Sequence, residues 1–83
     1  MQLLYFGWVR GKIGTDRETI DIPDGITDVR GLITWLRGQG KGYAEALAEP
    51  LVVRVAVNQE LADLDQPVTS SDEIAVFPPM TGG

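Results

Sequence analysis

Apolar residues near the N-terminus form two short segments with the character of β-strands. Residues 3–9 are an apolar run rich in aromatic side chains, which predicts a first strand. Polar and apolar residues alternate over residues 15–22, which predicts a half-buried second strand. Because Gly11 and Gly14 lie between the two segments, we expect a turn there and a β-hairpin.

A helix is predicted after the turn signal Pro23-Asp24-Gly25. Thr27 is the expected N-cap, and Asp28 would complement the positive end of the helix dipole. The helix is expected to end at Gly38 or Gly40. Its apolar stripe follows the spacing i, i+3, i+4, i+7 and consists of Val29, Leu32, Ile33 and Leu36.

The segment after this helix predicts a return to the sheet. Residues 43–49 could add one or two helical turns, which Pro50 would end. Residues 51–57 are nearly all apolar and β-branched, which predicts a central strand. A turn at Asn58-Gln59-Glu60 should follow, leading into a short segment over residues 61–64.

Residues 73–77 predict the last strand, and Pro78-Pro79 should stop it because proline cannot donate to a strand ladder. The predicted order is strand, strand, helix, short helix and three strands. This α+β order fits a ubiquitin-like β-grasp, a mixed sheet with one main helix packed on one face, and it also fits another small α+β roll. We expect one domain over residues 1–77 and an extended tail over residues 78–83.

The composition narrows the possible chemistry, because the chain has no cysteine and no histidine. These absences exclude a disulfide framework, zinc or iron–sulfur sites built on those residues, and Ser-His or Cys-His nucleophiles. An enzyme would have to rely on carboxylates, tyrosines, Lys12 or Lys41, so a carrier or binding module is expected. Asp72 and Glu73 offer too few converging ligands, so no metal site is expected.

The net charge of the chain limits the kinds of partner that it can bind. Seven Lys and Arg against twelve Asp and Glu give a formal net charge of −5. We therefore expect neither a nucleic acid nor an anionic membrane as partner. The acidity would suit a basic protein partner, or it only keeps the protein soluble. No basic segment precedes the first apolar run, and that run is too short to cross a membrane, so a cytoplasmic location is expected.

The tail is the feature with the clearest chemical meaning. Pro78-Pro79 favours a stiff extended backbone, whereas Gly82-Gly83 has no side chains. Six residues reach on the order of 20 Å when extended, enough to enter a pocket of another protein. A carboxylate on Gly83 would be unhindered and would become an acyl carrier if a partner adenylated it. A frayed chain end is the ordinary alternative for such a segment.

Several blocks of the sequence resemble the small subunit family of molybdopterin synthase. They are residues 54–60 (Arg-Val-Ala-Val-Asn-Gln-Glu), residues 72–83, which end Phe-Pro-Pro-Met-Thr-Gly-Gly, and the opening Leu-Tyr-Phe-Gly-Trp-Val-Arg of residues 4–10. The resemblance spans nearly the whole chain and is weakest over residues 38–50. Gly11 stands where the family usually has an acidic residue, and Ser71 where it usually has glycine. These departures affect the hairpin and a loop rather than the tail.

The resemblance implies a ubiquitin-like sulfur carrier that is not itself catalytic. Gly83 would be adenylated by a ubiquitin-activating-like adenylyltransferase that uses ATP and magnesium, and would then become a thiocarboxylate. Gly82, Thr81 and Met80 would give access to it. The tail would enter the large catalytic subunit, in a heterotetramer, and deliver sulfur to cyclic pyranopterin monophosphate. No cofactor would be bound stably by this chain.

Four further residues are candidates for partner docking. Alternation places Ile74 and Val76 on one face of the last strand, and Phe77 on the other face beside the tail. Phe77 is therefore either a docking aromatic or a packed edge residue, and Pro78 and Pro79 would accompany it. Arg54 interrupts an apolar strand and should point away from the helix. It would pair with a partner, be solvated, or pair with Glu73.

Other functions remain open from the sequence. Sulfur carriers for thiamine synthesis or tRNA thiolation also end in Gly-Gly, although the blocks quoted above fit the molybdopterin family better. A ubiquitin-like modifier would be joined to lysines through its C-terminal carboxylate. A plain interaction domain would have an inert tail, whose removal would leave function unchanged.

Overall fold

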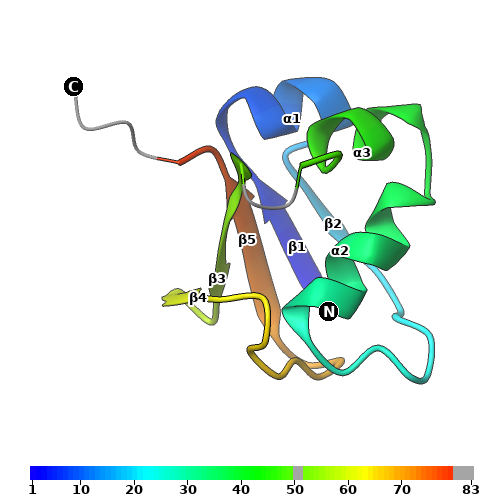
Figure 1. Ribbon diagram of the computed structural model, residues 1–83, viewed down its shortest axis with the longest axis vertical. Coiled ribbons are helices and arrows are strands. Elements are labelled where there is room, and N and C mark those ends of the chain that lie inside the picture. The colour runs from blue at the N-terminus through cyan, green and yellow to red at the C-terminus, as the bar shows by residue number, and fades with distance from the viewer. Residues whose placement is uncertain (50–51, 80–83) are drawn as a thin grey trace.

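A five-stranded mixed sheet, with strand order β2-β1-β5-β3-β4, carries helices α2 and α3 on one face (Figure 1). The computed structural model describes residues 1–49 and 52–79. Met80, Thr81, Gly82 and Gly83 lie outside the described residues, as do Pro50 and Leu51. The elements in chain order are β1 (Gln2–Tyr5), α1 (Gly7–Ile13), β2 (Arg17–Thr19), α2 (Val29–Arg37), α3 (Lys41–Ala46), β3 (Arg54–Val57), β4 (Glu60–Ala62) and β5 (Glu73–Phe77).

β5, at the centre of the sheet, is parallel to its neighbour β1, and the remaining pairs are antiparallel. β1 pairs with β5 in a register that places Leu3 beside Ile74 and Tyr5 beside Val76. β2 adds antiparallel to β1, and β3 adds antiparallel to β5. The first and last strands of the chain therefore lie side by side, with the last strand at the centre. This topology, with a helix packed on one face, confirms the predicted ubiquitin-like β-grasp.

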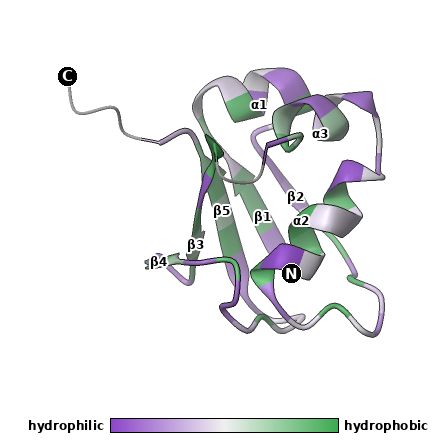
Figure 2. Cartoon of the chain, viewed as in Figure 1, coloured by the Kyte–Doolittle hydropathy of each residue, from purple (hydrophilic) through white to green (hydrophobic). Residues whose placement is uncertain are grey.

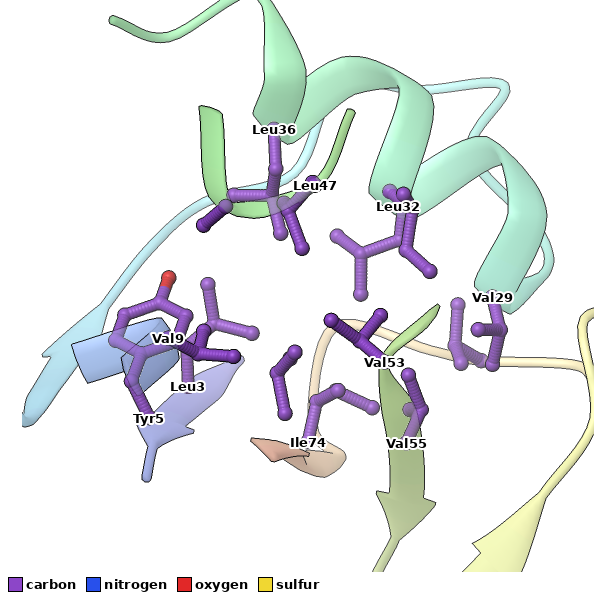
Figure 3. Packing of buried hydrophobic residues seen from close by; sticks show 14 of the residues in the cluster. Leu3, Tyr5, Val9, Val29, Leu32, Leu36, Leu47, Val53, Val55 and Ile74 are labelled. Carbon is purple, nitrogen blue, oxygen red and sulfur yellow. The ribbon is translucent and has the colours of Figure 1, made fainter. Parts of the chain in front are cut away.

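The core lies between this sheet and the helices. Leu32 and Leu36 of α2 point toward Leu3 and Ile74 of the sheet, and all four side chains are buried (Figure 3). The hydrophobic colour in Figure 2 follows β1, β3 and β5, whereas the outer loops are largely hydrophilic. Burial of such side chains contributes roughly 1.5–3 kcal/mol each relative to leaving them exposed. The predicted apolar stripe of the helix is thus the face that packs on the sheet.

The predicted hairpin near the N-terminus is wrong beyond Tyr5. The first strand ends there, and α1 occupies the segment between β1 and β2. Val9 is completely buried and Ile13 packs against the core four residues later, which is helical rather than strand spacing. Gly14, expected in a hairpin turn, instead caps this helix with φ 94°, and its N–H donates to the Arg10 carbonyl.

The remaining elements follow the sequence prediction with small shifts. The side chain of Asp28, not Thr27, caps α2 by accepting from the Gly31 N–H at 2.8 Å. The helix ends at Arg37 with Gly38 as its C-cap, which was one of the two predicted ends. β5 has the predicted limits, and β3 lies between two strands but one place from the centre of the sheet. The helical turns after Gly40 begin two residues earlier than predicted, at Lys41.

The turn between β3 and β4 is tight and tied to β5. Asn58 and Gln59 have positive φ values of 51° and 71°, the conformation of a two-residue hairpin turn. The Asn58 amide donates to Asp72 at 2.9 Å and accepts from the Glu73 N–H at 3.0 Å. The bond from Asn58, followed by one from the Thr69 N–H, holds the pKa of Asp72 below its usual range.

Within the described ranges, no helix has the length and hydrophobicity needed to cross a membrane. The cytoplasmic location predicted from the sequence stays a prediction.

Candidate functional site

The root of the tail is fixed against the start of α1. The Phe6 N–H donates to the Val76 carbonyl at 3.1 Å, which extends the β1–β5 pairing by one step. Gly7 then turns the chain with a φ of 58°, and Pro78 packs directly on it. A Cβ on Gly7 would lie 2.6 Å from Cγ of Pro78. The direction in which residues 78 and 79 leave the sheet is therefore set by α1 (Figure 1).

The face of the sheet opposite the helices has an apolar surface, which we call the open face. The strand register places Leu4, Ala75, Ala56 and Leu61 in one row across four strands. Leu61 is 72% exposed, whereas Leu4, Ala75 and Ala56 are half-buried. A contiguous apolar surface of this kind is typical of a protein-binding site.

Phe77 and Arg54 extend the open face to the root of the tail. The two residues are directly opposite each other in the β3–β5 register. Ile74 and Val76 are buried while Phe77 is half-buried, as the predicted alternation requires. Phe6, 49% exposed, follows β1 in extended conformation on the same side. The sequence therefore located Phe77 and Arg54 correctly, and their docking role stays a prediction.

An intramolecular partner for Arg54 is not found among residues 1–49 and 52–79. The ion pair recorded within those ranges joins Arg30 to Asp65. The register also separates Arg54 from Glu73, because Arg54 is opposite Phe77 while Ile74 is opposite Val57. The predicted alternative of an Arg54–Glu73 pair is therefore wrong, and the exposed guanidinium lies at the edge of the open face.

A hydrogen-bonded cluster of titratable side chains lies on the helix side of the sheet. The hydroxyls of Tyr5 and Tyr43 both donate to Oε2 of Glu18, at 2.7 and 2.6 Å. Burial, the hydrogen bond to Glu18 and its charge together raise the pKa of Tyr43 to about 12 and raise that of Tyr5 as well. Both phenols are thus held in the neutral, donating form, which suits a structural role joining α3 to the sheet rather than acid–base chemistry.

Sequence reasoning missed two features of the site. The start of α1 at Gly7 was hidden by the aromatic run over residues 3–9, which has strand character on both parities. A shift from alternating to helical spacing at Val9 and Ile13 was the available signal. Trp8 falls within the predicted first strand, but it lies on α1 and lines a groove beside this helix. Among the described residues, no group of three or more carboxylates could hold a metal ion.

Comparisons with known proteins cover the whole chain. The model of the ThiS family matches residues 3–83. A molybdopterin synthase sulfur carrier subunit from Escherichia coli (strain K12) is 38% identical, with 100% of this chain and 99% of that protein aligned. Solved structures are similar as well, among them the following two.

The first of these structures is SAMP1 from Haloferax volcanii, with a TM-score of 0.73, 26% identity, and coverage of 100% of this chain and 98% of that one. The second is a complex of subunits 1 and 2 of molybdopterin-converting factor from Helicobacter pylori 26695. The matched chain has a TM-score of 0.65 and 25% identity, and the match covers 99% of this chain and 96% of that one.

Proposed function

The chain belongs to the ThiS family, and from this membership we propose that it is the sulfur carrier subunit of a molybdopterin synthase. The observation that carries the proposal is that the similarity to sulfur carriers extends over the whole chain, including its last residues. The family match extends to Gly83, and the Escherichia coli sulfur carrier aligns with 100% of the chain. The likeness therefore includes the Phe-Pro-Pro-Met-Thr-Gly-Gly segment that would carry the chemistry, as well as the β-grasp domain.

The proposed chemistry takes place on the carboxylate of Gly83. A ubiquitin-activating-like adenylyltransferase transfers AMP from ATP, with magnesium, to this carboxylate and releases pyrophosphate. A sulfur donor then displaces AMP and leaves a thiocarboxylate. The sulfur passes to cyclic pyranopterin monophosphate in the large subunit, and two such transfers build the dithiolene. Gly82, next to Gly83, has no side chain and leaves the reacting group accessible, and Thr81 and Met80 complete the segment that enters the partner's site.

The fixed root of the tail supports this use. Pro78 rests on Gly7, so residues beyond it leave the domain in a defined direction. Restricting a reactive arm in this way lowers the entropy that a partner must remove when it binds the arm. The open face lies beside the same root, with Phe77 and Arg54 at its edge. We propose that the large subunit covers the open face while it takes in the tail, in an assembly with two copies of each subunit.

The experiment that tests the carrier function is an intact-mass measurement. The chain is incubated with ATP, magnesium, a sulfur donor and the cognate adenylyltransferase. We expect the mass to rise by the difference between a sulfur and an oxygen atom, located at Gly83 by fragmentation. A variant with one alanine added after Gly83 is the matched control and should stay unchanged. An unmodified wild-type chain, beside an enzyme that is active on another carrier, would refute the proposal.

A ubiquitin-like modifier is the second candidate, favoured by the likeness to SAMP1, the small archaeal modifier protein 1 of Haloferax volcanii. A modifier would form isopeptide bonds to lysines and produce adducts of higher mass in cells, which a pure carrier would not. A carrier for thiamine synthesis or tRNA thiolation would form the same thiocarboxylate. It would differ in the acceptor, so loaded chain supplied with the large subunit and cyclic pyranopterin monophosphate would yield no molybdopterin.

A further inference from the structure

A second exposed apolar surface lies on the helical side of the tail root. Trp8 of α1 is 40% exposed, and Val52, which precedes β3, is 45% exposed. Both line a groove of about 220 Å³ between α1 and the segment that follows α3, with the buried Ala46 at its base. We call this hollow the Trp8 groove. It is separate from the open face, which lies on the other side of the sheet.

The fold itself does not require Trp8 to be a tryptophan. α1 is held to the core by Val9, which is completely buried, and by Ile13. Trp8 points away from that core, whereas the chain's other tryptophan, Trp35, packs against it. A partly exposed tryptophan beside an apolar hollow is a common feature of the energetically important centre of protein interfaces.

The position of the groove connects it to the tail. Trp8 follows Gly7, and Gly7 is the residue on which Pro78 rests. Phe6 lies on the sheet side of this contact and Trp8 on the helix side. A protein that takes in the tail must approach this root, so it can cover the open face and the Trp8 groove with one continuous surface.

The charges around the groove indicate what would fill it. Glu45, Glu49 and Lys12 are its charged lining residues. None of the three takes part in an ion pair within residues 1–49 and 52–79, where the recorded pair is Arg30–Asp65. The rim therefore carries a net negative charge on a chain whose formal charge is −5. An apolar side chain flanked by lysine or arginine would match both the lining and the rim.

We propose that the Trp8 groove is a second contact surface for the large synthase subunit and that it receives an apolar side chain with a basic residue beside it. This inference rests on the proposed function. The large subunit is favoured over the adenylyltransferase because a lasting subunit assembly uses a larger and more apolar interface than a transient encounter. A related subunit 1 forms a complex with subunit 2 of molybdopterin-converting factor in Helicobacter pylori 26695.

Fluorine NMR on the full chain tests this contact directly. Fluorotryptophan is incorporated into the carrier alone, so that only Trp8 and Trp35 give signals. On adding the cognate large subunit, we expect the Trp8 signal to move and to lose its shift between H₂O and D₂O. The Trp35 signal should change little and serves as the internal control. A complex that forms with Trp8 still exposed to solvent overturns the groove inference and leaves the proposed function intact.

Two substitutions make the test quantitative. Trp8→Ala should raise the Kd for the large subunit about tenfold or more, the usual effect at an interface centre. Glu49→Lys should also raise the Kd. Asp24→Lys is its matched control, because it makes the same change in net charge in the turn before α2, outside the residues that line the groove. Equal Kd values for the Glu49→Lys and Asp24→Lys variants would show a general charge effect and contradict the proposed basic neighbour.

Two other outcomes would contradict the assignment of the Trp8 groove to the large subunit. If wild-type chain forms no complex with the large subunit, the proposed function fails and this inference fails with it. If Trp8 becomes protected only when the adenylyltransferase is added, the groove belongs to the other partner and the assignment to the large subunit is wrong. Thermal melting of the Trp8→Ala variant, expected close to wild type, excludes unfolding as the cause of weaker binding.

Discussion

Tyr5 and Tyr43 donate hydrogen bonds to the same carboxylate oxygen of Glu18, although they come from β1 and α3. Their rings meet edge to face with centroids 6.4 Å apart. This arrangement joins the inner strand β1, the edge strand β2 and the short helix α3. Such pairs of aromatic rings typically contribute about 0.5–1.5 kcal/mol beyond the area they bury.

The raised pKa values of these tyrosines predict a loss of stability in alkali. Tyr43 has a pKa of about 12 in the folded chain, and tyrosine in an unfolded chain has about 10. The folded state therefore binds more protons between these values, and its stability falls as the pH rises through them. Urea midpoints at a series of pH values check this. The Tyr43→Phe variant should lose less stability over the same range, and an equal loss would contradict the assignment.

Removing the shared acceptor should destabilise the fold at neutral pH. Glu18→Ala leaves the buried Tyr5 hydroxyl without its partner, and we expect a loss of about 1–3 kcal/mol in the free energy of unfolding. Chemical denaturation measures it. The double variant Glu18→Ala with Tyr5→Phe removes both the acceptor and the orphaned donor, and should recover part of the loss. No recovery would mean that the hydroxyl finds another partner.

Gly42 of α3 lies close against the backbone of Lys12 and Ile13 in α1. A Cβ at this position would collide with the backbone carbonyl oxygen of Lys12, which cannot rotate away. Gly42→Ala should therefore lower stability by roughly 1–3 kcal/mol. Gly11→Ala is the matched control, because a Cβ there meets no atom within 4 Å and alanine favours the helix by about 1 kcal/mol. Thermal melting should show opposite shifts for the two variants.

The N-cap of α2 is Asp28 rather than the predicted Thr27, and substitutions can test this. Asp28→Ala removes the side chain that accepts from the Gly31 N–H, and we expect a loss of about 1 kcal/mol. Thr27→Ala, at the position that the sequence favoured, should change stability much less. Urea denaturation of the two variants compares them, and a larger effect at Thr27 would place the cap one residue earlier.

A charged substitution on the open face should weaken binding to the large subunit without affecting folding. Leu61 is 72% exposed, so Leu61→Asp should alter stability by less than about 0.5 kcal/mol. It should weaken binding to the large subunit at least about tenfold, because a charge is then buried in an apolar interface. Thr34→Asp, exposed on α2, adds the same charge elsewhere and should bind normally. Calorimetric titration measures both.

Local sequence signals predicted an element correctly wherever its residues fitted only one type of secondary structure and had only one apolar face to bury. The stripe from Val29 to Leu36 could bury only one face, so α2 followed from its spacing. The limits of β5 followed from an apolar run closed by two prolines, which cannot continue a strand ladder. The proposed chemistry of Gly83 rests on the family resemblance and stays a prediction, because residues 80–83 lie outside the described structure.

Local signals could not decide whether the segment after Tyr5 continues the strand or forms a helix. Residues 3–9 are apolar at odd and even positions, so both a longer strand and a short helix satisfied the pattern. The choice depended on a long-range contact, because β1 ends where its parallel partner β5 ends, and Pro78 then occupies the space above Gly7. Trp8 consequently left the sheet and came to line a groove with residues from α3 and beyond.

The sequence by itself determined an α+β chain without cysteine or histidine, whose order of elements fits a β-grasp and also another small α+β roll. Composition and the order of elements follow from local patterns, whereas the strand order of the sheet decides for the β-grasp. Only the tertiary structure decided that Tyr5, Glu18 and Tyr43 share one hydrogen-bonded centre, and that Arg54 lies opposite Phe77 rather than beside Glu73. Strand register and helix docking bring together residues far apart in the chain, and no local pattern specifies which of them will meet.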